Sequence, residues 1–339
     1  ASGYTGADMI RLALGHPLLE IAALTGERKV GQRPGEIWPH LAMIPGLPVL
    51  AAVEDVDWSG LDVVFCCLPH GTSQQVIKGI VAGRGPKVID LSADFRLRDP
   101  DVYAQWYGHA HAAPELQGDA VYGLTEFYRA DIACAQLVAC PGCYPTAALL
   151  ALLPLLADGL IGSADIIIDA KSGVSGAGRG LKEQNLFAEV AEAMHPYGIG
   201  RHRHMPEIEQ ELSRVAGCAV TVSFTPHLVP MNRGELETIY VSLQGGASVE
   251  DAKAALAARY RDEPFVHVLD SAGVPATRMV RGSNHCVLNV FADRIAGRAI
   301  LVAAIDNLVK GSSGQALQNM NRMLGLDETL GLGQVALFP

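Results

Sequence analysis

The 339-residue sequence is poor in charged and aromatic residues and has no long apolar run. Charged residues make up 18% of the chain, below the usual level for a soluble domain, and aromatic residues make up 6%. The low charge disfavours a disordered chain and indicates much buried or intersubunit surface. The longest strongly apolar stretch, residues 147–157, contains Pro154 and is far shorter than a membrane span. We therefore expect no contact with a membrane.

The sequence also lacks a basic excess and a disulfide framework, and both absences reduce the number of functions that fit it. The net charge is −10, so the chain lacks the basic excess of a general nucleic-acid binder, and we expect no nucleic-acid partner. The seven cysteines are odd in number and scattered, which is unlike a disulfide framework. No secretory signal peptide is recognisable, and the chain begins at Ala1 without an initiator Met. These features predict a reducing compartment and a cytoplasmic protein.

The first half of the chain alternates apolar strands with amphipathic helices. Strands are expected over residues 19–24, 63–68, 88–91 and 136–140, and helices over residues 6–14 and 73–82. This alternation predicts a parallel sheet with helices on both faces. The second half begins with a helix over 146–157 and then has mostly strands, at 166–170, 220–224, 237–243, 265–269 and 286–291. A helix over 249–261 follows the N-cap Ser248, and another covers 314–324. Consecutive strands predict a mixed or antiparallel sheet in an α+β domain, with a boundary near residue 142.

The chain opens on a glycine loop that enters a helix. Ser2, Gly3, Tyr4, Thr5 and Gly6 make up this loop. Glycine permits a close backbone approach, and a helix N-terminus offers N–H groups to a phosphate. The loop therefore fits either a dinucleotide site or an ordinary turn. Further on, Arg28 and Lys29 would favour the 2′-phosphate of NADP, whereas Glu27 would favour NAD, and we expect NADP(H).

The segment around Cys143 carries the strongest chemical signal. An apolar strand ends at Cys140, a Pro-Gly turn follows, and Pro145 suits the first turn of the next helix. Cys143 should therefore lie at a helix N-terminus, whose field stabilises a thiolate. Alternatives are a Cys140–Cys143 redox pair, half of a zinc site, and buried structural thiols. The structural interpretation is the default for the remaining cysteines, Cys66, Cys67, Cys134, Cys218 and Cys286. We expect no metal.

Two other segments are candidates for binding or catalysis. Residues 201–207 are dense in ionisable groups, and His202 or His204 could be the acid/base partner of Cys143. The alternative is a solvated loop before a helix that starts near Pro206. Residues 172–178 are rich in glycine and serine, which would let a ring or a phosphate approach closely, and a flexible loop tip is the alternative.

Taken together, these motifs resemble the N-acetyl-gamma-glutamyl-phosphate reductase family of arginine biosynthesis, which belongs with the aspartate-semialdehyde dehydrogenases. The resemblance covers essentially the whole chain. Its marks are residues 1–6, 68–71, 90–96, 141–146, 172–178, 202–208, 230–234, 306–311 and 318–321. The family's first strand and the first glycine of its loop would precede residue 1.

The resemblance implies a Rossmann-type NADP-binding domain, residues 1–142 and 307–339, and an α+β catalytic and dimerisation domain with a largely antiparallel mixed sheet, residues 143–306. Cys143 matches the nucleophile and His202 the acid/base. Arg96 matches a phosphate-binding arginine, and Glu207, Arg203 and His204 would contact substrate. The expected cofactor contacts are Ser2, Gly3, Tyr4, Thr5, Gly6, Arg28, Pro69, His70, Ser172, Gly173, Ser175, Gly176 and Asn321.

The implied reaction is the NADPH-dependent reduction of N-acetyl-glutamyl 5-phosphate to the semialdehyde, through a thioester on Cys143. The expected partner is this small acyl phosphate, and the low charge favours a homodimer or homotetramer. A related acyl phosphate, aspartyl or carrier-linked aminoadipyl, would use the same chemistry. Two other classes stay open: a non-catalytic nucleotide-binding protein, and a thiol redox protein in which Cys140 is as necessary as Cys143.

Overall fold

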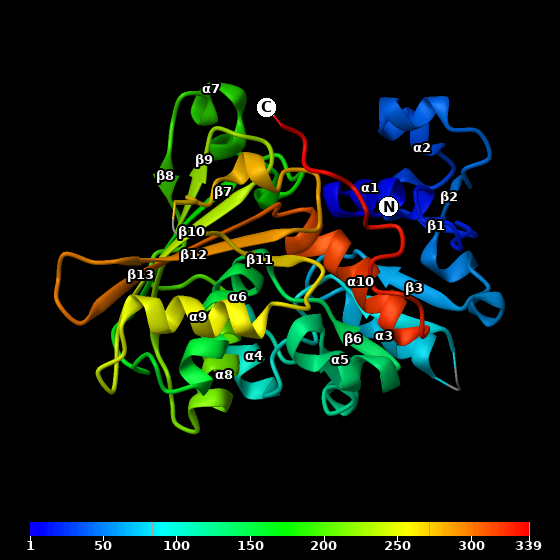
Figure 1. Cartoon of the computed structure of the whole chain (residues 1–339). Helices are drawn as coiled ribbons and strands as arrows, with labels where there is room; N and C mark the ends of the chain where they lie inside the picture. The colour runs from blue at the N-terminus through cyan, green and yellow to red at the C-terminus, as the bar shows by residue number, and fades with distance from the viewer. Residues whose placement is uncertain (83–84, 271, 339) are drawn as a thin grey trace. The chain divides into compact units, whose positions relative to one another are not determined.

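The computed structural model describes residues 1–82, 85–270 and 272–338, and the chain divides into two units (Figure 1). The first unit comprises Ala1–Pro141 and Ser312–Gly333. The second comprises Gly142–Gly311 and Gln334–Pro339. Each unit has its own sheet. Among the helices described, none has both the length and the apolar character that crossing a membrane requires.

The first unit is built on a parallel sheet of four strands in the order β3-β4-β6-β5. Their bounds are β3 Val63–Cys66, β4 Lys87–Asp90, β5 Ala120–Tyr122 and β6 Leu137–Ala139. A separate parallel pair joins β1, Leu24–Thr25, to β2, Leu50–Ala51. The central residues of β4 and β6, Val88, Ile89, Leu137 and Val138, are apolar and buried on both faces, as expected of parallel strands between two layers of helices.

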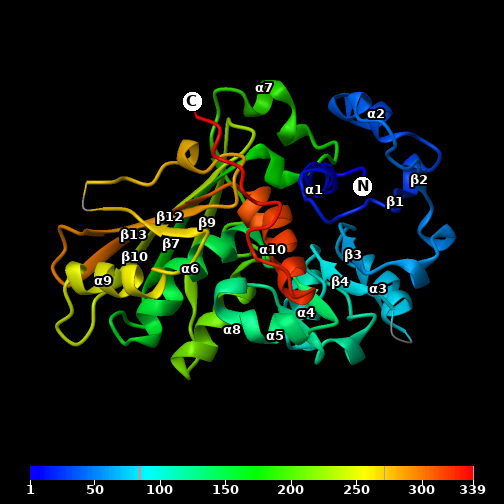
Figure 2. The same ribbon diagram turned by 45° about the vertical axis from the view of Figure 1, so that its right-hand side comes forward.

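Helices cover both faces of this parallel sheet. The helices of this unit are α1 Tyr4–Leu14, α2 Pro34–Ile37, α3 Ser73–Val81, α4 Pro100–Tyr107, α5 Thr125–Cys134 and α10 Gly314–Met323. Of these, α2 packs beside the β1–β2 pair, where Ile37 joins a core cluster with Leu24 and Leu50. On one face Ile77 and Ile80 of α3 join a core cluster with Val88. On the other face Val138 lies with Asn319 of α10 against Gly123, because successive residues of a strand point to opposite sides. Figure 2 shows α10 running past α5 within this unit.

The second unit is built on a seven-stranded mixed sheet in the order β11-β12-β13-β10-β7-β9-β8. The strands are β7 Ile166–Gly173, β8 His195–Pro196, β9 Val222–Val229, β10 Glu235–Ser242, β11 Val266–Val268, β12 Cys286–Ala292 and β13 Arg298–Ile305. Among the described strand pairs of this seven-stranded sheet, only β7–β9 and β11–β12 are parallel. The sheet is therefore largely antiparallel.

Three helices lie along one face of this sheet, as Figure 1 shows: α6 Cys143–Ala157, α8 Met205–Ala216 and α9 Val249–Arg259. A short helix, α7, spans Phe187–Val190. Residues 144–156 of α6 are all buried, as expected of a helix that is apolar all round. In β10 the residues that face the helices alternate with half-buried ones on the opposite face. The N-terminal end of α6 thus lies over the sheet, with β10 and β13 beneath it.

The predicted fold class is confirmed, whereas several predicted elements are wrong in extent or missing. The strand expected over 19–24 is reduced to the two residues of β1, Leu24–Thr25. The helix expected from Thr146 begins three residues earlier, at Cys143. Helices α4 and α5 and strands β5, β8 and β13 were not predicted. Strand β13, Arg298–Ile305, is rich in alanine and isoleucine, a pattern that periodicity cannot separate from a buried helix.

Candidate active site

Cys143 is the first residue of α6 and is half-buried. Gly142 is the N-cap, with an extended backbone at φ −67° and ψ 161°. The hydroxyl of Thr146 donates to the carbonyl of Gly142 at 2.9 Å and closes the first turn. Pro145 fits there because the first N–H groups of a helix have no intrahelical acceptor. The sulfur therefore lies in the positive field of a helix N-terminus, which favours the thiolate.

Glu207 of α8 holds the turn that carries Cys143. Its side chain is buried, and Oε1 accepts a hydrogen bond from the main-chain N–H of Gly142 at 2.8 Å. Within the second unit, this hydrogen bond gives the carboxylate a positioning role, because it anchors the residue directly before the nucleophile. The substrate contact expected of Glu207 stays a prediction.

Glu235 is a residue of this site that sequence analysis missed. It begins β10, its side chain is fully buried, and it lies beside Cys143. Burial raises the pKa of the Glu235 carboxyl to about 8; the hydrogen bond with the Cys143 thiol lowers it, and the charge of Asp306 raises it. A signal was present in the sequence, because Glu235 and Glu237 precede Ile239 and Val241 at a spacing of two. That spacing puts both glutamates on the inward face of the strand.

Two tyrosines stand next to the nucleophile. The hydroxyls of Tyr144 and Tyr197 are 3.1 Å apart. Burial raises the pKa of both phenols above its ordinary value, so both are neutral near pH 7. The charges of Cys143 and Glu235 contribute to the shift of each tyrosine, which places all four groups in one cluster. Neutral phenols can donate hydrogen bonds to a developing oxyanion.

His202 packs into the same cluster through its ring. Its ring centroid is 5.7 Å from that of Tyr144, 5.3 Å from that of Tyr197 and 5.3 Å from that of Phe224, a residue of β9. Burial, with a smaller contribution from the charge of Arg203, lowers the pKa of His202 to about 4. Its Nδ1 accepts the main-chain N–H of His204 at 3.2 Å, which assigns the proton of the neutral ring to Nε2. At neutral pH His202 is thus a hydrogen-bond donor through Nε2.

The other residues of the 201–207 segment divide into two groups. Arg201 and Arg203 are exposed in the loop before α8, as a solvated loop would have them. His204 is half-buried, and its ring centroid is 4.7 Å from that of His202 and 5.8 Å from that of Tyr144. The two histidines therefore lie in the same aromatic cluster as Tyr144, which leaves both as candidates for the acid/base role.

Arg96 belongs to the first unit and is buried. Its Nε donates to the carbonyl of Cys140 at 2.7 Å, and its Nη2 donates to the carbonyl of Leu91 at 3.2 Å. The guanidinium thus fixes the backbone at the carboxyl ends of β4 and β6. Sequence analysis predicted a phosphate contact for this side chain, and its buried charge lies at the edge of the sheet where ligands of such folds bind.

The opening glycine loop forms the start of α1 as predicted. Gly3 is the N-cap, and no side chain caps the helix. A Cβ on Gly3 would meet no atom within 4 Å, so the approach to these N–H groups is open. A Cβ on Gly6 would lie 2.8 Å from the Cα of Ala1, so only glycine fits there. Ser2 and Thr5 are half-buried and Tyr4 is exposed. An uncapped helix N-terminus of this kind suits a phosphate.

The other predicted cofactor contacts of the first unit belong to separate segments of the chain. Pro69 and His70 are exposed after the carboxyl end of β3, and Nδ1 of His70 accepts the N–H of Ala93 at 3.0 Å. Arg28 is exposed in a short 3₁₀ turn. Asn321 of α10 is fully buried, and its side chain bonds His16 and the carbonyls of Glu328 and Leu330. The Asn321 amide therefore holds the segment after α10, a structural role that sequence analysis did not predict.

The second glycine-rich stretch follows β7 in the second unit. Ser172 and Gly173 are buried, and a Cβ on Gly173 would meet the carbonyl oxygen of Asn232 at 2.7 Å. The hydroxyl of Ser175 accepts from the side chain of Asn307 at 3.0 Å, and Gly176 is exposed. Residues Val174–Ala177 of this stretch form a 3₁₀ turn. Its small residues are needed for internal packing.

The remaining cysteines bear on the alternatives for Cys143. All seven cysteines are free thiols, and Cys140 is buried. Within the ranges described, no three His, Cys, Asp or Glu side chains group so as to hold a metal ion, so the zinc interpretation finds no further ligands. Cys66 and Cys286 are buried and Cys67 is half-buried. The prediction that Cys134 and Cys218 are buried is wrong, because both are exposed.

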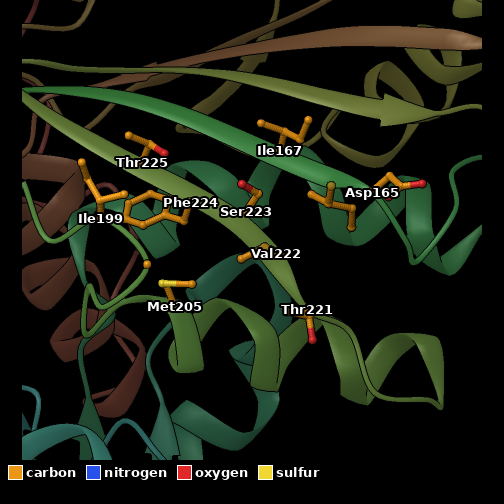
Figure 3. A pocket seen from close by; sticks show the side chains of 11 residues that line it. Asp165, Ile167, Ile199, Met205, Thr221, Val222, Ser223, Phe224 and Thr225 are labelled. Carbon is orange, nitrogen blue, oxygen red and sulfur yellow. The ribbon is translucent and has the colours of Figure 1, made fainter. Parts of the chain in front are cut away.

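A pocket of about 600 Å³ lies beside β9 in the second unit (Figure 3). Its lining is mostly aliphatic and hydroxyl-bearing, and includes Ile199, Met205 and Phe224. None of the predicted site residues lines it. It therefore carries no groups for the chemistry expected of Cys143, whose surroundings are the tyrosines, the histidines and the buried glutamates.

Known proteins that resemble this chain identify its family. Residues 1–135 match the family model of the semialdehyde dehydrogenase NAD binding domain, and residues 143–307 match its dimerisation domain. The chain is 57% identical over 342 residues to N-acetyl-gamma-glutamyl-phosphate reductase of Rhodospirillum rubrum, covering 100% of this chain and 97% of the relative. It is also 57% identical over 339 residues to a probable chloroplastic N-acetyl-gamma-glutamyl-phosphate reductase of Arabidopsis thaliana, covering 100% and 84%.

The fold has solved counterparts as well. Aspartate semialdehyde dehydrogenase II of Vibrio cholerae superposes with a TM-score of 0.72 at 18% identity, over 95% of this chain and 96% of the other. At that identity the likeness establishes the shared fold. The 57% sequence identity to the two reductases over the whole chain establishes the family as well. The chain belongs to the N-acetyl-gamma-glutamyl-phosphate reductases, within the semialdehyde dehydrogenase family.

Proposed function

We propose that this protein catalyses the NADPH-dependent reduction of N-acetyl-glutamyl 5-phosphate to N-acetyl-glutamate 5-semialdehyde, with release of phosphate, in arginine biosynthesis. The observation that carries the proposal is the position of Cys143. It is the first residue of α6, on a turn anchored by Glu207, in a chain that matches reductases of this name over its full length. We also propose that the first unit is the cofactor domain and the second the catalytic and dimerisation domain.

NADP(H) fits the first unit. The uncapped start of α1 at Gly3 offers main-chain N–H groups to a pyrophosphate, and Pro69 and His70 follow the carboxyl end of a parallel strand, where nucleotides bind in such sheets. Arg28 is exposed and available to a 2′-phosphate. When bound, NADPH supplies the hydride that reduces the acyl carbon. We propose Ser172, Gly173, Ser175, Gly176 and Asn321 as further cofactor contacts.

Catalysis would begin at sulfur. The Cys143 thiolate, favoured by the start of α6, attacks the acyl carbon; the bond to phosphate oxygen breaks, and phosphate leaves with the electron pair. Arg96 would neutralise phosphate charge. After reduction of the thioester carbon, the thiohemiacetal oxyanion would be held by N–H groups at the start of α6 and by neutral hydroxyls beside it. Its collapse breaks the C–S bond and returns the pair to sulfur.

His202 would hold or move a proton at the substrate oxygen. The neutral ring carries its proton on Nε2, so it can donate to the oxyanion without first being protonated by solvent. Arg203 and His204, on the same loop, would bind the anionic groups of the substrate. These assignments rest on the shared cluster around Tyr144 and on the family resemblance.

We further infer that the protein works as a homodimer or homotetramer in the cytoplasm. The match of residues 143–307 to a dimerisation domain supports an oligomer. The sheet face of β10 that α6 does not cover carries half-buried residues that a second copy could bury. Seven free thiols support a reducing compartment. Sedimentation equilibrium should give twice or four times the mass of the chain, and a monomer at micromolar concentration would overturn the oligomer.

The function is tested by running the reaction backwards, as phosphate-dependent reduction of NADP with N-acetyl-glutamate semialdehyde. We expect activity that is abolished in Cys143→Ser and largely kept in Cys140→Ala. Aspartate semialdehyde and NAD serve as comparison substrate and cofactor and should react poorly. Equal loss in both cysteine variants would instead indicate a dithiol mechanism. No turnover in folded wild-type protein would overturn the proposal.

A further inference from the structure

Glu235 occupies an unusual position for a carboxyl group. It is fully buried at the first position of β10, between Ser172 of β7 and Ile305 of β13. Neither carboxyl oxygen has a hydrogen bond of ordinary geometry among the described residues. Ile305, the β13 partner of Glu235, lies against Gly311, where an added Cβ would be 3.2 Å from Cδ1 of Ile305 and 2.7 Å from Cβ of Cys143. Glu235 therefore lies beside the nucleophile, whose thiol also acts on the pKa of its carboxyl.

The charges around Glu235 favour its neutral form. The titratable groups that act on it are the thiol of Cys143, the carboxylate of Asp306, the carboxyl of Glu237 and the phenols of Tyr144 and Tyr197. None of these groups is a cation. The cations of the region have other neighbours. Arg233 pairs with Asp306 at 3.5 Å and Lys171 with Asp169 at 2.5 Å, and Nζ of the buried Lys310 lies 5.8 Å from the ring centroid of Phe265. A buried carboxylate without a cation is costly, so the group stays protonated.

We propose that Glu235 is a further catalytic residue, a neutral carboxylic acid whose O–H hydrogen-bonds to the sulfur of Cys143 whenever that sulfur is negatively charged. The inference rests on the thioester chemistry proposed above. The sulfur is negative before it attacks the acyl carbon and again after the C–S bond breaks. In both states the O–H of Glu235 donates to it. The proton remains on Glu235 throughout, so the step consumes none.

Whether Glu235 stabilises or destabilises the Cys143 thiolate depends on the protonation state of its carboxyl group. A protonated carboxyl donates a hydrogen bond and stabilises the thiolate. An ionised carboxyl repels the thiolate and accepts from the thiol instead. The burial that raises the pKa of Glu235 to about 8 keeps it protonated at neutral pH, and it ionises only in mild alkali. The thiolate should therefore be favoured by Glu235 near pH 7 and disfavoured by it above pH 8.

The test is the rate at which iodoacetamide alkylates Cys143, measured by peptide mass spectrometry across about pH 6 to 10, where thiols titrate. It needs neither substrate nor cofactor. The background is Cys134→Ser with Cys218→Ser, because both of those thiols are exposed. Glu235→Gln is compared with Glu237→Gln, a matched control on the same strand and face that is also fully buried without hydrogen bonds. Circular dichroism reports folding.

We expect the plot of alkylation rate against pH for Glu235→Gln to cross the plot for the background protein that keeps Glu235. Near pH 7 alkylation should be slower, by roughly threefold to tenfold, because an amide is a weaker donor to a thiolate than a carboxylic acid. Above about pH 9 it should be faster, because the variant carries no carboxylate. Glu237→Gln should follow the parent. Glu235→Leu, which neither donates nor ionises, should be slower still near pH 7 and keeps the test open if the glutamine variant misfolds.

Two outcomes overturn the proposal. Faster alkylation of Glu235→Gln at every pH would show that Glu235 only destabilises the Cys143 thiolate by charge repulsion. An unchanged dependence of the alkylation rate on pH would show that Glu235 does not act on the sulfur. A kinetic measurement separates this failure from failure of the proposed function. In the active enzyme, kcat of Glu235→Gln should fall by about tenfold to a hundredfold, as for loss of one stabilising donor. If wild type shows no turnover yet the profiles cross, the proposed reaction is wrong and the Glu235–Cys143 pairing stands.

Discussion

The main-chain N–H of Gly142 donates to Oε1 of Glu207 at 2.8 Å, across 65 positions of the sequence. Gly142 caps α6, and the next residue is Cys143. The orientation of the nucleophile is therefore set by a carboxylate on a different helix, α8. A donor buried in this way depends on its partner, because removing the acceptor leaves an uncompensated N–H.

Replacing Glu207 should consequently affect both stability and turnover. Glu207→Ala should reduce kcat by at least tenfold and the free energy of unfolding by about 1–3 kcal/mol, because the N–H of Gly142 loses its acceptor. Glu207→Gln keeps an acceptor and should be milder in both respects. Urea denaturation and steady-state kinetics provide the measurements. The control is Glu211→Gln, one turn along α8 and also buried; equal loss of kcat in the two glutamine variants would contradict a specific role for Glu207.

Gly311 should be equally sensitive, for a steric reason. A Cβ at this position would lie 2.7 Å from the Cβ of Cys143 and 3.1 Å from its Cα. Since both are atoms of the helix start and cannot swing away, Gly311→Ala should displace the nucleophile and lower kcat by tenfold or more. Gly118→Ala meets no atom within 4 Å and is the control. Wild-type kcat in Gly311→Ala would show that the turn can move without penalty.

The two histidines of the cluster can be separated by substitution and by pH. His202→Asn should lower kcat/KM by about a hundredfold or more, as expected for loss of an acid/base group, and His204→Asn by less. Because burial lowers the pKa of His202 to about 4, its protonation should not affect kcat/KM between pH 7 and 5. A larger loss of kcat/KM in His204→Asn would assign the acid/base role to His204. A fall of kcat/KM near pH 6.5 that is absent in His202→Asn would show that the His202 ring is not buried.

Stability should fall as the solution becomes alkaline. Burial raises the pKa of Glu235 from its ordinary 4.5 to about 8, and it raises that of Glu237 as well. Between those two pH values the folded state holds a proton that the unfolded state has lost, so stability decreases as pH rises through this window. The double variant Glu235→Gln with Glu237→Gln should match wild type near pH 4 and exceed it at pH 9, by on the order of a few kcal/mol. Chemical denaturation at the two pH values measures this, and an equal difference at both would refute it.

Local sequence signals were sufficient for part of the site. The Pro-Gly turn before Cys143 and the proline at the third position of α6 place the thiol at a helix start from sequence alone. The alternation of strands and helices likewise predicts the parallel sheet of the first unit, and the run of strands in the second half predicts its mixed sheet. These features depend on neighbours within a few residues.

Other features depend on residues distant in the chain and could not be predicted in that way. The anchoring of Gly142 by Glu207 becomes visible only when α8 is packed against α6. Glu235 was missed because strand β10 was expected to begin at residue 237, two residues late, which left the carboxyl in a loop. The amide of Asn321, a predicted cofactor contact, also joins His16 to the chain segment after α10, a link that depends on tertiary packing.

The seven thiols fall into two populations with different fates in an oxidising solution. Cys134 and Cys218 are exposed, whereas Cys66, Cys140 and Cys286 are buried and Cys67 and Cys143 are half-buried. A disulfide between copies of the chain needs two accessible thiols, so oxidation in storage should first link molecules through Cys134 and Cys218. Covalent oligomers on a non-reducing gel would then form while the nucleophile is still intact. In an oxidising solution, activity and reduced monomer should thus be lost at different rates.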